Sequence, residues 1–195
     1  MRAGKILIYP TETFYGLGVD IFQPHALEAL FQLKGRDAGK AMSVLVSHQE
    51  QVKNLVSVFD DKILNLIDLF LPGPVTFVLK ALDRVPISLQ SEGGFVGIRM
   101  SPNLIAEELL KRFGGPITTT SANPSGEASA RSLSDLKRYF DDREDLFFLS
   151  GGDLPPSRGS TVVKIDANRL KLLREGDIPF SKIETAFGVN PNAED

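Results

Sequence analysis

The amino-acid sequence predicts an α/β protein whose sheet is partly parallel. Short apolar, β-branched runs alternate along the chain with longer stretches in which apolar residues recur at helical spacing. Clusters of glycine, proline and serine separate these runs, as they do at turns between elements. With 195 residues, 42% of them hydrophobic, the chain has the size and composition of one globular domain.

The first half of the chain is expected to contain four strands and two helical segments. Pro10 closes the first apolar run, and Pro24 suits the first turn of a helix that Gly35 then ends. The second helical segment is broken near Ser57, and Asp60 favours a new helix start beyond that break. The expected strands span residues 5–9, 42–46, 75–80 and 95–100, the helices 24–34 and 48–70, and the loops 10–18 and 86–94.

The second half continues the alternation. Ser101 and Pro102 are predicted to be an N-cap and a first-turn proline, and their helix runs to about Phe113. Further strands are expected at 117–120, 146–149, 161–165 and 170–174, with a helix at 132–140 and a loop at 151–159. We expect residues 1–188 to form a single domain and the polar residues 189–195 to be a disordered tail.

Composition excludes several classes of protein and site. The chain has no cysteine, which excludes disulfides and thiolate metal sites, and two histidines are too few for a histidine-rich site. No run approaches the roughly 18 apolar residues of a membrane-spanning helix, and the N-terminus lacks the apolar core of a signal peptide. We therefore expect a cytoplasmic protein with no membrane contact. A net charge of −3 argues against nucleic-acid binding through bulk charge but leaves room for a local basic pocket.

Residues 116–126 are the first candidate for chemistry. The strand that begins at Ile117 runs into Ser-Ala-Asn-Pro-Ser-Gly, and loops at strand ends form the ligand crevice of open α/β sheets. An ordinary polar turn has the same composition. Lys34, Arg36 and Lys40 are the second candidate, because three cations around one glycine-containing loop suit a polyphosphate. The alternative is that these cations only complement a helix dipole.

Two arginines, Arg99 and Arg174, close apolar strands. A guanidinium in such a place is partly desolvated and needs a partner, which is either a carboxylate at the edge of the core or a small carboxylate ligand. Thr13 and Ser160 lie at loop–strand junctions, where a turn or capping role is the alternative to ligand contact. No familiar nucleotide motif fits, since residues 35–41 are one residue short of a P-loop and lack its Ser or Thr.

Together these segments resemble the YrdC/TsaC family of threonylcarbamoyl-AMP synthases. Lys34-Gly35-Arg36 matches the Lys-x-Arg signature of that family, and Ser121-Ala122-Asn123 matches its Ser-x-Asn signature. Five other segments fit in the right order: 10–18, 72–76, 96–99, 159–163 and 172–176. The resemblance covers about residues 4 to 180, and seven motifs in order form a specific signal although each alone is weak.

The resemblance implies a YrdC-like twisted, open, mixed sheet flanked by helices, with a large concave, positively lined cavity. It implies a nucleotidyltransferase, L-threonylcarbamoyladenylate synthase, which makes threonylcarbamoyl-AMP and pyrophosphate from L-threonine, bicarbonate and ATP with Mg²⁺. The tRNA threonylcarbamoyl-transferase machinery would be a transient partner that passes the group to the adenosine beside the anticodon. Direct RNA binding by this chain is compatible with that role.

The resemblance also assigns roles to residues. The catalytic signature corresponds to Lys34, Arg36, Ser121 and Asn123. The ATP contacts correspond to Arg36, Lys40, Ser121, Ser129 and Arg174. The threonine contacts correspond to Thr13, Arg99, Thr119 and Ser160. No side chain is assigned to a metal.

Some features depart from the family pattern. Phe95 stands where many relatives have a hydroxyl that contacts the nucleotide, and Leu45 stands where some longer relatives have a threonine-contacting histidine. Relatives usually carry a helix before the first strand, where this chain has residues 1–4. We also expect no C-terminal domain of the kind found in longer yeast-type and archaeal members.

Three alternatives compete with the synthase interpretation. One is an RNA-binding YrdC-like module without synthase activity, against which the acidic net charge counts. Another is a fold relative that has lost the activity, although such relatives tend to lose the two signature pairs that this chain keeps. The third is a carbamoyl-transfer domain of hydrogenase maturation proteins, which occurs in longer chains with zinc-finger cysteines.

Overall fold

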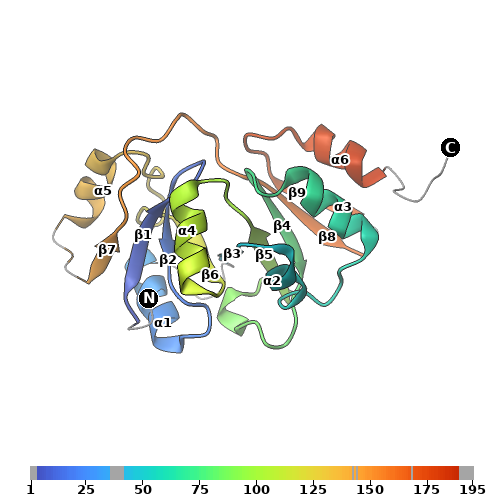
Figure 1. Ribbon diagram of the computed structural model, residues 1–195, viewed down its shortest axis with the longest axis horizontal. Helices are drawn as coiled ribbons and strands as arrows, with labels where there is room; N and C mark the ends of the chain where they lie inside the picture. The colour runs from blue at the N-terminus through green and yellow to red at the C-terminus, as the bar shows by residue number, and fades with distance from the viewer. Residues whose placement is uncertain (1–3, 36–41, 142, 144, 168, 189–195) are drawn as a thin grey trace.

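The computed structural model describes residues 4–35, 42–141, 143, 145–167 and 169–188 (Figure 1). Its strands are β1 (Ile6–Pro10), β2 (Tyr15–Gly18), β3 (Ser43–Leu45), β4 (Val75–Lys80), β5 (Phe95–Arg99), β6 (Ile117–Ser121), β7 (Leu146–Phe148), β8 (Thr161–Asp166) and β9 (Arg169–Arg174). Its helices are α1 (Pro24–Lys34), α2 (Gln49–Lys53), α3 (Asp61–Phe70), α4 (Leu104–Phe113), α5 (Leu133–Phe140) and α6 (Phe180–Gly188), with a short 3-10 helix at Ile87–Leu89. The predicted tail, residues 189–195, lies outside the described residues.

Within the described ranges, nine strands form one mixed sheet in the order β7-β1-β2-β6-β3-β5-β4-β8-β9. The pairs β1/β7, β3/β5 and β4/β8 are parallel, and the other neighbouring pairs are antiparallel. Helices flank this sheet along its length (Figure 1). The prediction of an α/β fold with a partly parallel sheet is therefore confirmed.

The structure corrects three sequence-based expectations. Part of the predicted loop 10–18 is a strand, because β2 pairs with both β1 and β6. The N-cap of α4 is Asn103, whose side chain accepts the backbone N–H groups of residues 105 and 106, so the prediction that Ser101 caps this helix is wrong. Helix α6 was not predicted, although its Ile183 is fully buried in the core.

Several predicted helix ends are confirmed. Gly35 ends α1 at a positive φ of 56°, where glycine avoids the steric cost that other residues meet. The Asp60 carboxylate accepts the N–H of Ile63 and so caps α3 after the expected break in the helical segment. Ser132 and Asp135 form a capping box at the start of α5.

The glycines of β2 make room for an aromatic ring of β1. A Cβ at Gly18 would lie 2.8 Å from Tyr9 Cε1, and one at Gly16 would lie 3.1 Å from Tyr9 Cζ. The Tyr9 ring is fully buried there, and its hydroxyl donates to the carbonyl of Thr118 at 3.1 Å. The two glycines thus permit close packing, and burial raises the pKa of the Tyr9 phenol.

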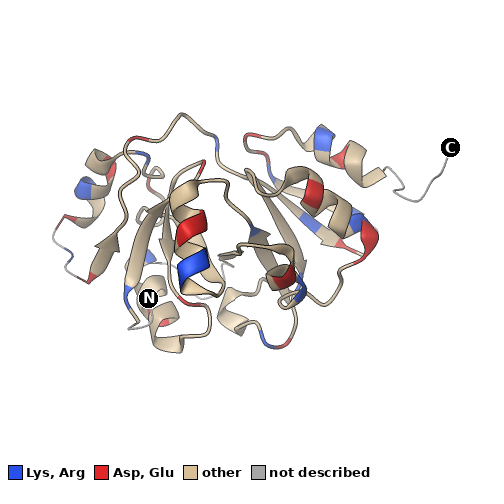
Figure 2. Ribbon diagram, in the orientation of Figure 1, with Lys and Arg blue, Asp and Glu red and all other residues tan. Residues whose placement is uncertain are grey.

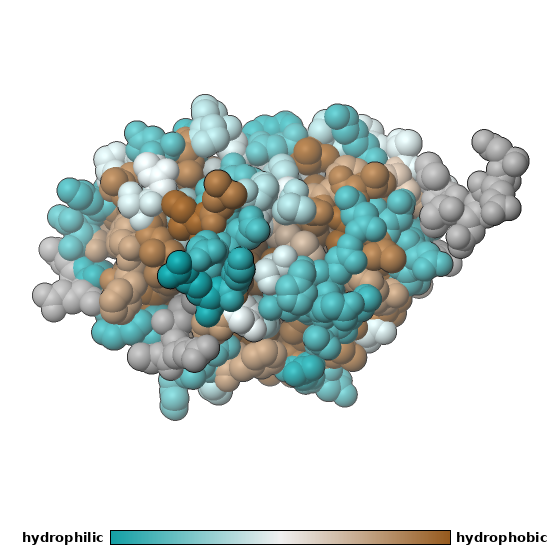
Figure 3. Space-filling model, in the orientation of Figure 1, coloured by the Kyte–Doolittle hydropathy of each residue, from teal (hydrophilic) through white to brown (hydrophobic). Residues whose placement is uncertain are grey.

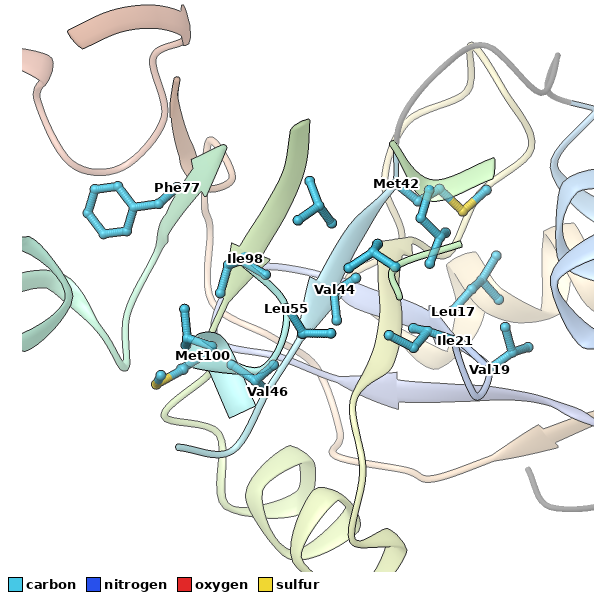
Figure 4. Close-up of a cluster of buried hydrophobic side chains, with 14 of the residues drawn as sticks. Leu17, Val19, Ile21, Met42, Val44, Val46, Leu55, Phe77, Ile98 and Met100 are labelled. Atoms are coloured by element: carbon cyan, nitrogen blue, oxygen red, sulfur yellow. The ribbon is translucent and has the colours of Figure 1, made fainter. Parts of the chain in front are cut away.

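Two hydrophobic layers hold the sheet between helices. Leu7 and Tyr9 of β1 pack in a cluster with Ala106 and Leu110 of α4. The opposite side chains of β1 belong to the main core, which continues through α1, α3 and α6. Figure 4 shows part of that core between Leu17 and Phe77.

Acidic and basic residues are both distributed over the helices, strands and loops (Figure 2). Figure 3 shows hydrophilic and hydrophobic residues interspersed over the same face. Among the described residues, every helix is too short or too polar to cross a membrane.

Side-chain alternation on the central strands sets up the site. On β4 and β5, Phe77, Val96 and Ile98 point into the main core. The intervening side chains, which include Thr76 and Arg99, therefore point to the other face of the sheet.

Candidate functional site

A cavity of about 310 Å³ lies on that other face of the central strands. It is formed where the ends of β2, β4, β5, β6, β8 and β9 come together. Its lining is Thr11, Thr13, Phe14, Tyr15, Gly16, Met42, Ser43, Thr76, Arg99, Thr119, Thr120, Ser121, Ser129, Ser160, Val162 and Arg174. Hydroxyl groups and two guanidinium groups dominate, so the cavity suits a polar, anionic ligand.

The structure brings together most of the residues that the sequence singled out. Seven of them line the cavity: Thr13, Arg99, Thr119, Ser121, Ser129, Ser160 and Arg174. Lys34 and Asn123 contact the strand and loop that carry Ser121 but are not part of the lining. Arg36 and Lys40 lie outside the described residues.

Arg99 forms an ion pair at one end of the cavity. Its Nη2 donates to Glu12 Oε1 at 2.5 Å and to Thr13 Oγ1 at 2.6 Å, and Glu12 Oε2 accepts from the Ser101 hydroxyl at 2.5 Å. The pairing with a carboxylate at the core edge, one of the two partners considered for Arg99, is present. Arg99 is only 9% exposed, and among the described residues its Nε has no hydrogen-bond partner although it is buried. Such a buried donor favours a further acceptor at this end.

Arg174 also lines the cavity and is bonded to neutral oxygens. It donates from Nη2 to the carbonyl and hydroxyl oxygens of Ser160, at 2.9 and 3.0 Å. The Ser160 hydroxyl in turn accepts from Thr76 at 2.9 Å. Burial lowers the pKa of the Arg174 guanidinium, and the nearby charge of Arg99 lowers it further. An anion bound close to these two guanidinium groups would therefore be stabilised.

Two glycines let the chain hold Arg174 against Ser160. Gly159 has a φ of 89°, in the left-handed region that favours glycine. A Cβ at Gly176 would lie 2.1 Å from the carbonyl oxygen of Gly159, so only glycine permits the close approach of the two segments. The Gly159 and Gly176 positions of the sequence motifs thus have a structural role beside the cavity.

Lys34 ties the end of α1 to the loop after β6. Its ammonium donates to the carbonyl oxygens of Ser121 and Asn123 at 2.8 and 2.7 Å, and to Asn123 Oδ1 at 2.8 Å. The Ser121 hydroxyl donates to the same Oδ1 at 2.6 Å, and the Asn123 amide donates to the carbonyl of Glu127. Lys34 is 5% exposed. The signature residues Lys34, Ser121 and Asn123 therefore form one buried network that fixes the Ser121 hydroxyl.

Several residues of the site were not predicted from the sequence. Glu12 belongs to the motif at 10–18, but nothing in the sequence indicated that its carboxylate would contact Arg99. Thr76 and Ser43 lie on short apolar strands, and strict alternation along each strand could have placed them on the polar face. Tyr15 holds the loop at 151–152, since its hydroxyl donates to Gly152 O at 2.7 Å and accepts from Gly151 N at 2.9 Å.

The two residues that depart from the family pattern lie away from the cavity. Phe95 starts β5, at the opposite end from Arg99, and Lys164 Nζ lies 3.5 Å from the centroid of its ring. Leu45 is fully buried in the cluster against α4. As for metals, the described residues contain no group of three or more His, Cys, Asp or Glu side chains that could hold an ion.

The model of the family described as telomere recombination, Sua5/YciO/YrdC, matches residues 1–176. The chain belongs to the Sua5/YciO/YrdC family. This confirms the resemblance on which the residue assignments were based.

Relatives within the Sua5/YciO/YrdC family agree with the fold. The crystal structure of Pyrococcus abyssi Sua5 complexed with L-threonine superposes with a TM-score of 0.89 at 31% identity, over 96% of this chain and 55% of that chain. Escherichia coli YciO superposes with a TM-score of 0.80 at 27% identity, over 90% of this chain and 85% of that chain. The threonylcarbamoyl-AMP synthase of Marinobacter nauticus is 33% identical over 164 residues, which are 83% of this chain and 86% of the relative.

This chain thus spans about half the length of the Pyrococcus protein and most of the length of the shorter family members. Relatives from Pyrococcus abyssi and Marinobacter nauticus carry the name threonylcarbamoyl-AMP synthase. The likeness to Escherichia coli YciO and Pyrococcus Sua5 supports the α/β fold with a mixed sheet flanked by helices.

Proposed function

We propose that this chain is an L-threonylcarbamoyladenylate synthase, which converts L-threonine, bicarbonate and ATP into threonylcarbamoyl-AMP and pyrophosphate in the cytoplasm. Residues 1–188 would act as one YrdC-like domain. The observation that carries the proposal is the convergence of seven family-assigned residues on one cavity. Relatives named threonylcarbamoyl-AMP synthase support it.

Threonine is assigned to the part of the cavity around Arg99. Arg99 would bind the threonine carboxylate, and its buried Nε–H, which lacks a partner among the described residues, supports this role. Thr13, Thr119 and Ser160 line the same space with hydroxyl groups that can donate to or accept from the amino acid. The Glu12 carboxylate would hold Arg99 in place through the contact at 2.5 Å.

ATP is assigned to the part of the cavity around Arg174. Arg174, Ser121 and Ser129 would contact the nucleotide, together with Arg36 and Lys40, which lie outside the described residues. With these cations, the cavity would have the positively charged lining that the family implies. Mg²⁺ would arrive as the ATP complex, held by phosphate oxygens and neutralising their charge.

The residues that line the cavity suit a reaction that needs no protein nucleophile. The threonine amine attacks carbon dioxide formed from bicarbonate, loses a proton and gives a carbamate. A carbamate oxygen then attacks the α-phosphorus of ATP, and the bond from that phosphorus to the bridging oxygen breaks, so pyrophosphate leaves. The protein contributes orientation and charge stabilisation. Lys34 and Asn123 would act by fixing Ser121 beside the reacting groups.

The product would pass to the tRNA threonylcarbamoyl-transferase machinery, because a carbamoyl adenylate is an activated group donor. Direct RNA binding by this chain would bring the product close to its acceptor. An RNA-binding module without synthase activity stays the alternative to the enzyme, and it predicts RNA binding that falls steeply with salt, without turnover of ATP.

Pyrophosphate release from ATP by the purified chain tests the proposal, with L-threonine and bicarbonate each added or omitted. We expect release only when both are present. Release without threonine would indicate a different adenylate chemistry. A well-folded protein that releases no pyrophosphate with Mg²⁺ present would overturn the synthase proposal and favour the RNA-binding module.

A further inference from the structure

Thr76 is a buried polar residue of the cavity to which no role has been assigned above. It lies on β4 between Val75 and Phe77, whose side chains belong to the main core, so the Thr76 side chain points to the cavity face of the sheet. It lines the cavity and is 2% exposed. A hydroxyl buried in this way is expected to have a hydrogen-bond partner, and that partner indicates what the hydroxyl does.

Packing fixes the direction of the Thr76 hydroxyl. A Cβ at Gly97 would lie 3.2 Å from Thr76 Cγ2, so the methyl group of Thr76 packs over the bare backbone of Gly97 on β5. A β-branched side chain has few χ1 choices. With its methyl group over Gly97, Thr76 directs Oγ1 to Ser160 and donates to Ser160 Oγ at 2.9 Å.

The Ser160 hydroxyl accepts two hydrogen bonds and keeps one proton to donate. Its oxygen accepts from Thr76 Oγ1 at 2.9 Å and from Arg174 Nη2 at 3.0 Å. A hydroxyl has two acceptor lone pairs and one O–H donor, so both lone pairs are occupied. Among the described residues the Ser160 proton has no acceptor, and Ser160 lines the cavity while being 4% exposed. This hydroxyl is therefore available as a donor to a ligand in the cavity.

The strand register places Thr76 beside Arg99. Strands β4 and β5 are antiparallel, and Phe77 lies opposite Ile98. One position further along, Thr76 lies opposite Arg99, and residues opposite each other share a face of the sheet. Arg99 Nη2 is already used in the contacts with Glu12 and Thr13, whereas its buried Nε–H lacks a partner within the described part of the chain. A carboxylate that accepts from this Nε–H has a second oxygen that needs another donor.

We propose that Thr76 is a positioning residue, which holds the Ser160 hydroxyl as a hydrogen-bond donor to the carboxylate of the bound amino acid. This inference rests on the proposed function and adds a residue to it. Arg99 would bind one carboxylate oxygen and Ser160 the other, so Thr76 acts through Ser160. Without the Thr76 hydroxyl, Ser160 has a free lone pair, and its O–H is no longer held toward the ligand.

The test compares the wild-type chain with Thr76→Val, which keeps the β-branched shape, and Thr76→Ser, which keeps the hydroxyl. In Thr76→Val the KM for L-threonine should rise roughly fivefold, as for the loss of one uncharged hydrogen bond. The kcat should stay near that of the wild type, because the carboxylate is bound alike in the ground state and the transition state. The KM for ATP should not change, since Arg174 keeps its bonds to the Ser160 carbonyl at 2.9 and 3.2 Å. Thr76→Ser should recover most of the threonine affinity.

Thr185→Val is the matched control. It removes the same hydroxyl from an exposed position on α6, where Thr185 donates to the carbonyl of Ser181 at 2.8 Å, and it should change none of these values. An unchanged KM for threonine in Thr76→Val would overturn the positioning role. A rise in the KM values for threonine and ATP alike, without recovery in Thr76→Ser, would also overturn it and leave Thr76 a packing residue.

Calorimetry with L-threonine alone separates this inference from the proposed function, because it needs no turnover of ATP. A wild-type chain that binds threonine, and binds it more weakly as Thr76→Val, but releases no pyrophosphate from ATP would refute the synthase and support the positioning role. Equal threonine affinity in the two proteins, with normal pyrophosphate release by the wild type, would refute the positioning role and leave the synthase. A wild-type chain that binds no threonine would refute both.

Discussion

Replacing Lys34 with methionine tests the buried network that carries the signature residues. Lys34 is 5% exposed, and its ammonium donates to three oxygens at 2.7 to 2.8 Å. Methionine keeps the unbranched apolar stem but removes this ammonium. Two of those oxygens are backbone carbonyls of the loop that carries Ser121. The substitution therefore leaves acceptors unsatisfied in a place that water reaches poorly.

The size of the effect follows from these contacts. Hydrogen bonds from charged groups contribute about 1.5–3 kcal/mol each, and water that enters the space left by the ammonium recovers part of that loss. We expect the free energy of unfolding to fall by about 3 kcal/mol. In a domain of this size, about 1 kcal/mol lowers Tm by about 2–4 °C, so Tm should fall by about 6–12 °C. We expect turnover to fall by roughly 10²–10³, the usual effect of losing one charge-stabilising donor, since Ser121 is no longer held.

Thermal unfolding followed by circular dichroism and pyrophosphate release at saturating substrates measure the two effects separately. Lys53→Met is the control, because Lys53 is 45% exposed, pairs with Glu50 at 2.7 Å on the surface of α2 and lies 5.4 Å from the centroid of the Phe59 ring. It should lower Tm by less than about 1 °C, as expected of an exposed pair. A Lys34 variant with wild-type Tm would refute the energetic argument. One with lowered Tm but near-normal turnover would show that the network serves stability alone.

Three further results are expected. Arg99→Lys should raise the KM for threonine roughly tenfold in steady-state kinetics, because the forked donor is lost while the charge stays, and an unchanged KM would count against Arg99 as the carboxylate clamp. Gly176→Ala should lower the free energy of unfolding in urea titrations by about 3 kcal/mol or more, since its Cβ would lie 2.1 Å from the carbonyl oxygen of Gly159. Because burial raises the pKa of Tyr9 above the 10.0 of the unfolded chain, its contribution to stability is full below pH 10.0 and is lost as the pH rises beyond it. Above that pH, the free energy of unfolding of Tyr9→Phe should fall less steeply with pH than that of the wild type, by up to about 1.4 kcal/mol per pH unit. Equal slopes of unfolding free energy against pH in the two proteins would contradict this.

Local chemistry explains why most of the fold could be predicted. Gly35, Asp60 and Ser132 end or begin helices through bonds within a few residues of themselves, so their sequence signals are sufficient. Strand β2 was not predicted, because its two glycines are typical of a turn. Its conformation depends on pairing with β1 and β6 and on packing against the ring of Tyr9. Tertiary contacts of this kind leave no local signal.

The candidate site, too, could be predicted only in part from the sequence. The hydroxyl-rich loop and the strand-ending arginines could be found from residue type and position, and the cavity gathers them. The Arg99–Glu12 pair could not be assigned, because 87 positions separate the two residues and the sequence offered either a protein or a ligand carboxylate as partner. A second pocket, beside Phe14, depends on loops at 128–131 and 156–158 that only the fold brings together.

The pairing of Arg99 with Glu12 makes the two arginines of the cavity electrically unlike. Beside Arg99 a carboxylate lies at 2.5 Å, so that region is close to neutral. Arg174 contacts only the uncharged oxygens of Ser160 among the described residues, and its positive charge stays uncompensated. Under the proposed function, a zwitterionic amino acid would suit the neutral region, whereas an amino acid with an acidic side chain would bring a surplus negative charge next to Glu12. A phosphate group would be favoured beside Arg174.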